Sequence, residues 1–298
     1  NNTAVGKGAL TANTTGSYNT AVGHQALQAS TADDHSTAIG AQALMTQGAG
    51  GVGDGRNTAV GRDAGRLNTT GTYMVAVGYE ALELNTTGSF NTSVGGASLY
   101  NNTTGSYNTA VGRTALTANT TGDTMTAVGY QALLSNTTGT NNTALGTRCL
   151  DANTTGTNNV AVGDMALGEN TTANSNTAVG VDALKVNTTG AVNVAVGYLA
   201  LNSNTTANYN NALGYEALKD NTTGAVNVAV GYLALTSNTT ASYNNALGYE
   251  ALKDNTTGAS NVAIGKGALE NNTTASNNTA VGHQALLANT TGAQNTAI

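Results

Sequence analysis

Asparagine followed by two threonines is the triplet with the most chemical potential in this 298-residue chain. Each triplet satisfies the Asn-x-Ser/Thr rule for N-linked glycosylation. Asn and Thr also suit turns and hydrogen-bonded side-chain ladders that carry no sugar. Both interpretations stay open at this stage: a glycosylated corner and an unmodified one. The candidate acceptors are Asn13, Asn68, Asn85, Asn102, Asn119, Asn136, Asn153, Asn170, Asn187, Asn204, Asn221, Asn238, Asn255, Asn272 and Asn289.

Other reactive side chains are few, and their spacing defines no site. Cys149 is the single cysteine, and no histidine or carboxylate is placed to activate it, so we expect a small buried filler. His24 and His283 lie fifteen repeats apart and cannot share a metal ion. His35 follows two aspartates, a pattern more typical of a solvated turn than of a metal loop. The sequence therefore predicts no enzyme, no metal site and no cofactor.

A short tandem repeat positions these side chains. The phrase Asn-Thr-Ala-Val-Gly, or a close variant, begins at residues 2, 19 and 36. It begins again at residue 57 and then at every seventeenth residue to 295. The step from 36 to 57 is the single longer one. This makes seventeen complete repeats and the start of another. We number the repeat positions 1 to 17, with Asn2 at position 1. A Gly-rich insertion at 45–56 is either a binding loop, since insertions in solenoids collect on one face, or a tolerated corner.

This period predicts an all-β fold, a parallel β-solenoid or β-roll. Seventeen residues are too few for a strand, a helix and two loops, and Gly and Asn-Thr-Thr interrupt any helical period. We expect residues 1–298 to form a single solenoid with one coil per repeat and parallel in-register ladders between coils. At about 4.8 Å per coil the rod would be roughly 80 Å long, and glycans on successive corners would crowd each other.

The residue types at each position predict their places in the coil. Val, Ile or Leu at position 4 and Leu at position 9 are expected to form the core, with position 4 inward by strand alternation. Positions 3 and 8 are mostly Ala, which predicts tight sites. Position 5 is Gly in every complete repeat, which predicts a positive φ or a close backbone approach.

Position 6 varies freely and is expected to face solvent. Tyrosines there would form an exposed stripe, which is either a stacking surface for sugars or a plain surface ladder. The stripe consists of Tyr79, Tyr130, Tyr198, Tyr215, Tyr232 and Tyr249.

Composition narrows the classes of partner. Ten basic against sixteen acidic residues, a net charge of −6, argue against nucleic acid and anionic membranes. No apolar run approaches the roughly 20 residues of a membrane span. The Ala and Gly positions suit close packing between chains, which predicts a homotrimer. Because the chain stops within a predicted strand and has no capping repeat, we expect an internal fragment of a longer chain or filament.

The phrase Asn-Thr-Ala-Val-Gly followed by x-x-Ala-Leu resembles repeats in the heads of trimeric autotransporter adhesins. The chain is also similar to shaft repeats of bacteriophage tail fibres, in which Asn-Thr-Ala-Leu-Gly-Tyr and Asn-Asn-Thr-Thr-Gly runs recur. The resemblance covers the whole chain, although the period is longer than that of the adhesin roll. It implies a trimeric, extracellular, rod-like shaft or adhesive head.

The expected function is that of a structural or adhesive fibre, a shaft or head that presents receptor-binding elements at a phage or bacterial surface. Its partners would be copies of itself and a cell-surface glycan or receptor. A near-perfect duplication, 193–226 against 227–260, fits a spacer role. The alternative is an extracellular filament protein that stacks end to end and is glycosylated on its Asn-Thr-Thr corners. An ice-binding solenoid is a minor alternative, disfavoured because adjacent threonines at a corner should point apart.

Overall fold

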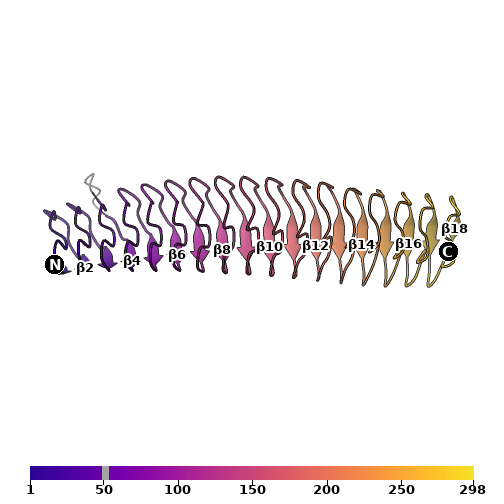
Figure 1. Cartoon of the computed structure of the whole chain (residues 1–298), viewed down its shortest axis with the longest axis horizontal. Helices are drawn as coiled ribbons and strands as arrows, with labels where there is room; N and C mark the ends of the chain where they lie inside the picture. Colours follow the sequence, from indigo (N-terminus) through magenta and orange to yellow (C-terminus); the bar gives the residue numbers. More distant parts are fainter. Residues whose placement is uncertain (49–53) are drawn as a thin grey trace. The chain divides into compact units, whose positions relative to one another are not determined.

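The computed structural model of the chain describes residues 1–48 and 54–298 and shows a parallel β-solenoid. Each coil contributes one short strand, and the described residues contain strands, turns and bends but no helix (Figure 1). The predicted all-β class and the arrangement of one coil per repeat are confirmed. The coils fall into two compact units, Asn1–Thr155 and Gly156–Ile298. Residues 49–53 of the predicted insertion lie outside the described residues.

Nine strands are described in the first unit, and they form one parallel sheet. Their bounds are β1 (Thr3–Val5), β2 (Thr20–Val22), β3 (Thr37–Ile39), β4 (Thr58–Val60), β5 (Val75–Val77), β6 (Thr92–Val94), β7 (Thr109–Val111), β8 (Thr126–Val128) and β9 (Thr143–Leu145).

The second unit has the same plan. Its strands are β10 (Val160–Val162), β11 (Thr177–Val179), β12 (Val194–Val196), β13 (Asn211–Leu213), β14 (Val228–Val230), β15 (Asn245–Leu247), β16 (Val262–Ile264), β17 (Thr279–Val281) and β18 (Thr296–Ala297).

Within each unit the ladders are parallel and in register, as the repeat predicts. Thr3 pairs with Thr20 in the first unit, and Val160 pairs with Thr177 in the second. The register survives the insertion, because Thr37 of β3 pairs with Thr58 of β4 across the longer interval. The sheet therefore keeps one register on both sides of the longer interval.

Backbone hydrogen bonds also join the coils outside the strands, and they run in both directions. The amide of Leu27 donates to the carbonyl of Ala43 in the following coil at 3.1 Å. The amide of Gln25 donates to the carbonyl of Lys7 in the preceding coil at 2.9 Å. Each coil is thus tied to both neighbours along most of its circumference.

The interior holds smaller side chains than the sequence predicts, and the prediction that position 4 lies in the core is wrong. Position 3, such as Ala110, and position 8, such as Ala115, are fully buried, and so is Leu116 at position 9. Position 4 points outward: Leu145 is 49% exposed and Ile39 is 41% exposed. Side chains alternate along a strand, so either the odd or the even repeat positions could face inward. The odd positions do so because the asparagine at position 1 makes hydrogen bonds in the interior.

Glycine at position 5 is confirmed as a conformational requirement. Its φ lies between 128° and 144° in every complete repeat. A Cβ atom on Gly112 would stand 2.3 Å from the carbonyl oxygen of Gly129 in the next coil. Neither the φ nor the contact tolerates a side chain.

Three further positions, mostly occupied by residues other than glycine, adopt left-handed backbone, which the sequence does not predict. Examples are Tyr18 at position 17 with φ 61°, Gln25 at position 7 with φ 58° and Leu27 at position 9 with φ 48°. Such a conformation costs roughly 1–2 kcal/mol for an ordinary residue. It turns the chain sharply enough to close so short a coil, and the hydrogen bonds between coils hold it in place.

Two ladders of buried asparagines line the interior. At position 12, the Nδ2 group of Asn102 donates to Oδ1 of Asn85 in the preceding coil at 2.7 Å. At position 1, Oδ1 of Asn91 accepts the backbone amide of Asn108 at 2.9 Å. The predicted asparagine ladder is confirmed, but its amides lie inside the coil and not at an exposed corner.

The two ladders meet at one backbone carbonyl in most coils. The carbonyl of Gly105, at position 15, accepts Nδ2 of Asn91 at 2.8 Å and Nδ2 of Asn102 at 2.9 Å. The same pair of bonds recurs in the second unit, where Asn176 and Asn187 donate to Gly190. These bonds close the coil by fixing positions 1 and 12 to position 15.

Replacing one ladder asparagine should therefore destabilise the chain strongly. Asn119→Ala removes the Nδ2 group that donates to Asn102 Oδ1 and to the Gly122 carbonyl, so both buried acceptors lose this hydrogen bond. We expect a loss of about 3 kcal/mol, since an unsatisfied buried polar group costs about 1–3 kcal/mol. Urea unfolding followed by circular dichroism measures it.

The matched control is Thr121→Ala, further along the same turn at an exposed site. It should change the unfolding free energy by less than about 0.5 kcal/mol. Equal, small effects of both substitutions would contradict an interior role for the ladder.

Candidate functional site

The outward face of the sheet carries no charged side chain in the described strands. Repeat positions 2 and 4 lie in the strand and face out. In all described strands they hold only Thr, Val, Asn, Ile or Leu. Leu213 and Leu247 at position 4 are each 49% exposed. A contiguous apolar patch of this kind is typical of an interaction surface.

The candidate glycosylation sites face away from solvent. The amide of Asn136, for example, is fully buried, and its Nδ2 group donates to Asn119 Oδ1 and to the Gly139 carbonyl. Of the two threonines that follow an acceptor, the first typically donates its hydroxyl to the next coil, as Thr86 does to Thr103, and the second is exposed.

Burial is common to nearly all of the candidate acceptors. Only the terminal members, Asn13 and Asn289, have partly open side chains. A glycan on a buried amide would have to displace the interior hydrogen bonds, so glycosylation forms no part of the function proposed below. Intact-mass spectrometry of the chain after secretion from a glycosylating host tests it directly.

The coils beside the insertion depart from the asparagine pattern. Ser30 and Gln47 stand at position 12, and Ser36 stands at position 1. Asp33 replaces the usual Gly or Ala at position 15 and is fully buried. Its carboxylate accepts the Ser30 hydroxyl at 3.2 Å and the Gln47 amide at 3.3 Å, and Gln47 in turn accepts Nδ2 of Asn57 at 2.8 Å. The longer glutamine and the carboxylate fill the space that the two serines leave.

Burial raises the pKa of Asp33 above its ordinary value of 3.8, opposed by the hydrogen bonds from Gln47 and Ser30. The folded protein therefore holds this proton more tightly than the unfolded chain does. The stability that this group contributes is fully present below pH 3.8 and is lost as the pH rises through the raised value.

Asp33→Asn should remove the loss of stability that the ionised Asp33 carboxylate causes as the pH rises. The amide keeps the shape and can donate to the Ser30 hydroxyl, so we expect greater stability than wild type at pH 7 and a smaller difference at pH 3. Thermal melting of both proteins across this range measures it. Asp220→Asn, at an exposed site, is the control and should leave the pH profile unchanged. A variant that is less stable than wild type at pH 7 would refute the assignment.

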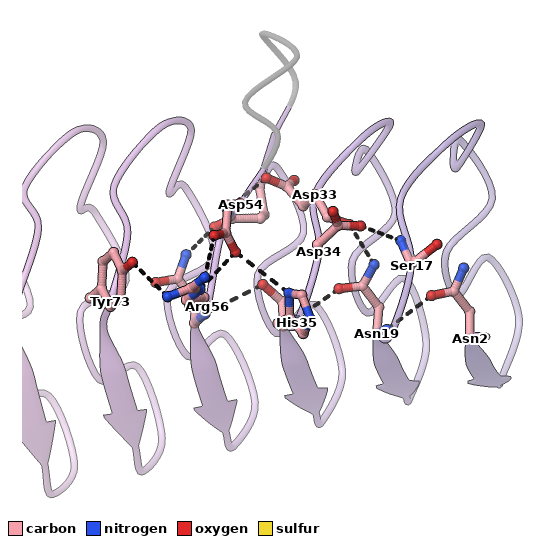
Figure 2. Close-up of polar contacts among 12 residues, drawn as sticks. Asn2, Ser17, Asn19, Asp33, Asp34, His35, Asp54, Arg56 and Tyr73 are labelled. Atoms are coloured by element: carbon pink, nitrogen blue, oxygen red, sulfur yellow. Dashed lines mark hydrogen bonds and ion pairs between the residues drawn. The ribbon is translucent and has the colours of Figure 1, made fainter.

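A surface cluster lies on the same coils (Figure 2). Asp54 forms an ion pair with Arg56 at 2.8 Å, and His35 Nδ1 lies 3.6 Å from its carboxylate. The ring of His35 stacks on Tyr18 at 5.2 Å, and Arg56 donates to the Tyr73 hydroxyl at 2.9 Å. The cluster is half-exposed, and its side chains link neighbouring coils.

This cluster does not gather the residues of a metal loop. The carboxylate of Asp33 points into the coil, and the carboxylate of Asp34 accepts the backbone amide of Ser17 (Figure 2). His35 contacts Asp54 instead. Over residues 1–48 and 54–298, no group of three or more His, Cys, Asp or Glu side chains converges.

The remaining sequence candidates lie apart. Cys149 is fully buried at an alanine position, with Sγ 3.1 Å from the Gly146 carbonyl, as predicted for a filler. His24 and His283 are both exposed at position 6. Of the six tyrosines predicted to form a stripe at position 6, four in the second unit stack on one another, whereas Tyr79 lies under the guanidinium of Arg62.

No family model matches the chain, and no curated protein matches it. No pocket opens in the part of the chain that the structure describes. None of the described residues form a helix that could cross a membrane. The surfaces that carry an argument about function are therefore the outward sheet face and the exposed aromatic side chains.

Proposed function

We propose that the chain is a structural segment, a shaft or head, of an extracellular fibre at a phage or bacterial surface. Copies of the chain associate laterally through their outward sheet faces, three copies in the arrangement we favour. The observation that carries the proposal is the row of outward Val, Ile and Leu side chains at position 4, in which the Ile and Leu members are exposed and most Val members are half-buried. Catalysis has no part in it.

The sheet face supports lateral association for two physical reasons. Burying apolar side chains contributes about 25 cal/mol per Å² of area removed from water. The absence of charge at positions 2 and 4 of the described strands spares such an interface the cost of desolvating ions. Three copies arranged around one axis would cover all three faces at once, which fits the resemblance of the repeat to trimeric fibre proteins.

Continuous hydrogen bonding between coils supports a mechanical role. Backbone ladders, threonine hydroxyls and two asparagine ladders all run from coil to coil within a unit. Pulling two coils apart would break several of these bonds together. A segment of this kind holds a binding element at a distance from a surface.

An open filament is the alternative, in which copies add without limit. Light scattering distinguishes the two, because a closed trimer has three times the 29.6 kDa of one chain and a filament has no fixed mass.

One observation favours a second function, ice binding. In the first unit eight of nine strands carry an outward threonine at position 2, beside an apolar residue at position 4. In-register pairing sets these hydroxyls in a straight row with a spacing of about 4.8 Å. Thermal hysteresis of a dilute solution tests this, and its absence excludes the function.

A charge on the sheet face should disrupt the fibre. Leu213→Lys places an ammonium group in the apolar row, and we expect the native mass to fall to that of a single chain. Thr223→Lys puts the same charge at an exposed turn position and should leave the assembly intact. Sedimentation of the two variants beside wild type is the measurement. A wild-type chain that is monomeric at high concentration, or equal assembly of both variants, would contradict lateral packing.

A further inference from the structure

Four tyrosines on successive coils of the second unit form a stack of exposed rings. The centroids of Tyr198 and Tyr215 are 5.3 Å apart, those of Tyr215 and Tyr232 are 5.2 Å apart, and those of Tyr232 and Tyr249 are 5.0 Å apart. The planes differ by 26°, 15° and 13°. Each residue is between 42% and 46% exposed.

The stacking decides what these rings can contact. Each inner ring has both faces covered by its neighbours, so a sugar cannot stack on it. Because the faces of the inner rings are covered, their exposed part lies at the ring edges. The ortho carbons beside each hydroxyl, where phenoxyl radicals couple, lie on those open edges and belong to rings whose centroids are 5.2 Å apart at the centre of the stack.

We propose that Tyr198, Tyr215, Tyr232 and Tyr249 form an oxidative cross-linking site, at which adjacent rings couple to dityrosine and join successive coils covalently. Each of two phenols loses one electron and one proton, and a carbon–carbon bond forms between their ortho carbons. The hydrogens on those two carbons then move to the phenol oxygens, which restores both aromatic rings. The oxidant is hydrogen peroxide acting through one-electron steps, and it takes up the two electrons and two protons to give two molecules of water for each bond formed.

One member of the stack has a proton acceptor beside it. The carboxylate of Glu216 accepts a hydrogen bond from the Tyr215 hydroxyl and raises the pKa of that phenol. When the ring loses an electron, its proton can pass to this carboxylate. Tyr215 is therefore the expected first site of oxidation, with a stacked tyrosine on either side as coupling partner.

None of the other eight tyrosines has a tyrosine at the same repeat position in a neighbouring coil. Tyr73 and Tyr107 belong to a stack of the same spacing, but Phe90 stands between them, at 5.1 and 5.0 Å. Tyr209 and Tyr243 are more exposed than the stacked four, at 58% and 61%, but Val226 occupies the coil between them. These residues serve as internal controls within the same chain.

The central contact of the stack is a product of the sequence duplication. Tyr198 and Tyr215 belong to residues 193–226, and Tyr232 and Tyr249 are their copies in residues 227–260. The duplication turns one tyrosine pair into a row of four. The inference is independent of the proposed fibre function, because all four rings belong to one chain.

The experiment oxidises the dilute full chain with a peroxidase and hydrogen peroxide, and then denatures and digests it with trypsin. Cleavage after Lys185, Lys219 and Lys253 gives peptides 186–219 and 220–253. Coupling of Tyr215 with Tyr232 joins them into one product, two hydrogens lighter than the sum. We expect this product, with dityrosine fluorescence, and fragmentation that places the bond on those two residues.

Tyr232→Phe keeps the stacked ring and removes the hydroxyl, so the joined peptide should be lost while a Tyr198–Tyr215 bond within peptide 186–219 remains. The matched control, Tyr243→Phe, should leave the joined peptide at the wild-type amount. Oxidation in urea should spread the bonds over all twelve tyrosines. Bonds through Tyr209 or Tyr243 in the folded chain, equal loss in both variants, or the absence of any dityrosine would overturn the proposal.

Discussion

Two buried asparagine amides share one backbone carbonyl in most coils, and the rest of the coil is arranged around that pair of hydrogen bonds. The Gly105 carbonyl, which accepts from Asn91 and Asn102, is an example. A buried amide left without partners is costly, so the ladders must continue from coil to coil once they begin. This requirement holds position 1 inside, which in turn places Ala inside and Val outside along the strand.

The same constraint explains the surface. Because asparagine amides, alanines and the leucines of position 9 fill the interior, the apolar residues of position 4 have no room there and form the outward sheet face. The coil therefore differs from an ordinary domain in leaving one of its two regular rows of large apolar side chains outside the core. Where the pattern is interrupted, at Ser30, Asp33 and Gln47, the replacements rebuild a connected set of buried hydrogen bonds.

Much of the fold could be predicted from the sequence, since the period, the glycine at position 5 and the leucine at position 9 each have one physical solution in a short coil. Which face of the strand points inward could not be predicted. Thr-Ala-Val can place either its central residue or its two outer residues inside, and hydrophobicity favours the outer pair, which is the wrong choice. The asparagines were assigned to a corner for a similar reason: a single Asn-Thr-Thr triplet suits a turn, and only the stack of coils makes its amide an interior group.

The candidate surfaces were predictable in part. Tyrosine at position 6 indicates an exposed stripe, but the stacking of Tyr198 on Tyr215 depends on side-chain orientation across coils. The burial of Asp33 depends on substitutions in two coils at once, and its own neighbours in the sequence give no sign of it. Left-handed backbone at Leu27 runs against the preference of leucine and follows from the need to close the coil.

Hydrogen–deuterium exchange of the asparagine side-chain amides, followed by nuclear magnetic resonance, measures whether the two buried ladders hold the coil together. We expect strong protection of the amides at positions 1 and 12, such as those of Asn108 and Asn119, which are fully buried. We expect fast exchange for the exposed position-17 amides of Asn141, Asn158 and Asn277. Uniformly fast exchange of all asparagine side chains in the folded protein would show that the ladders do not hold the coil together.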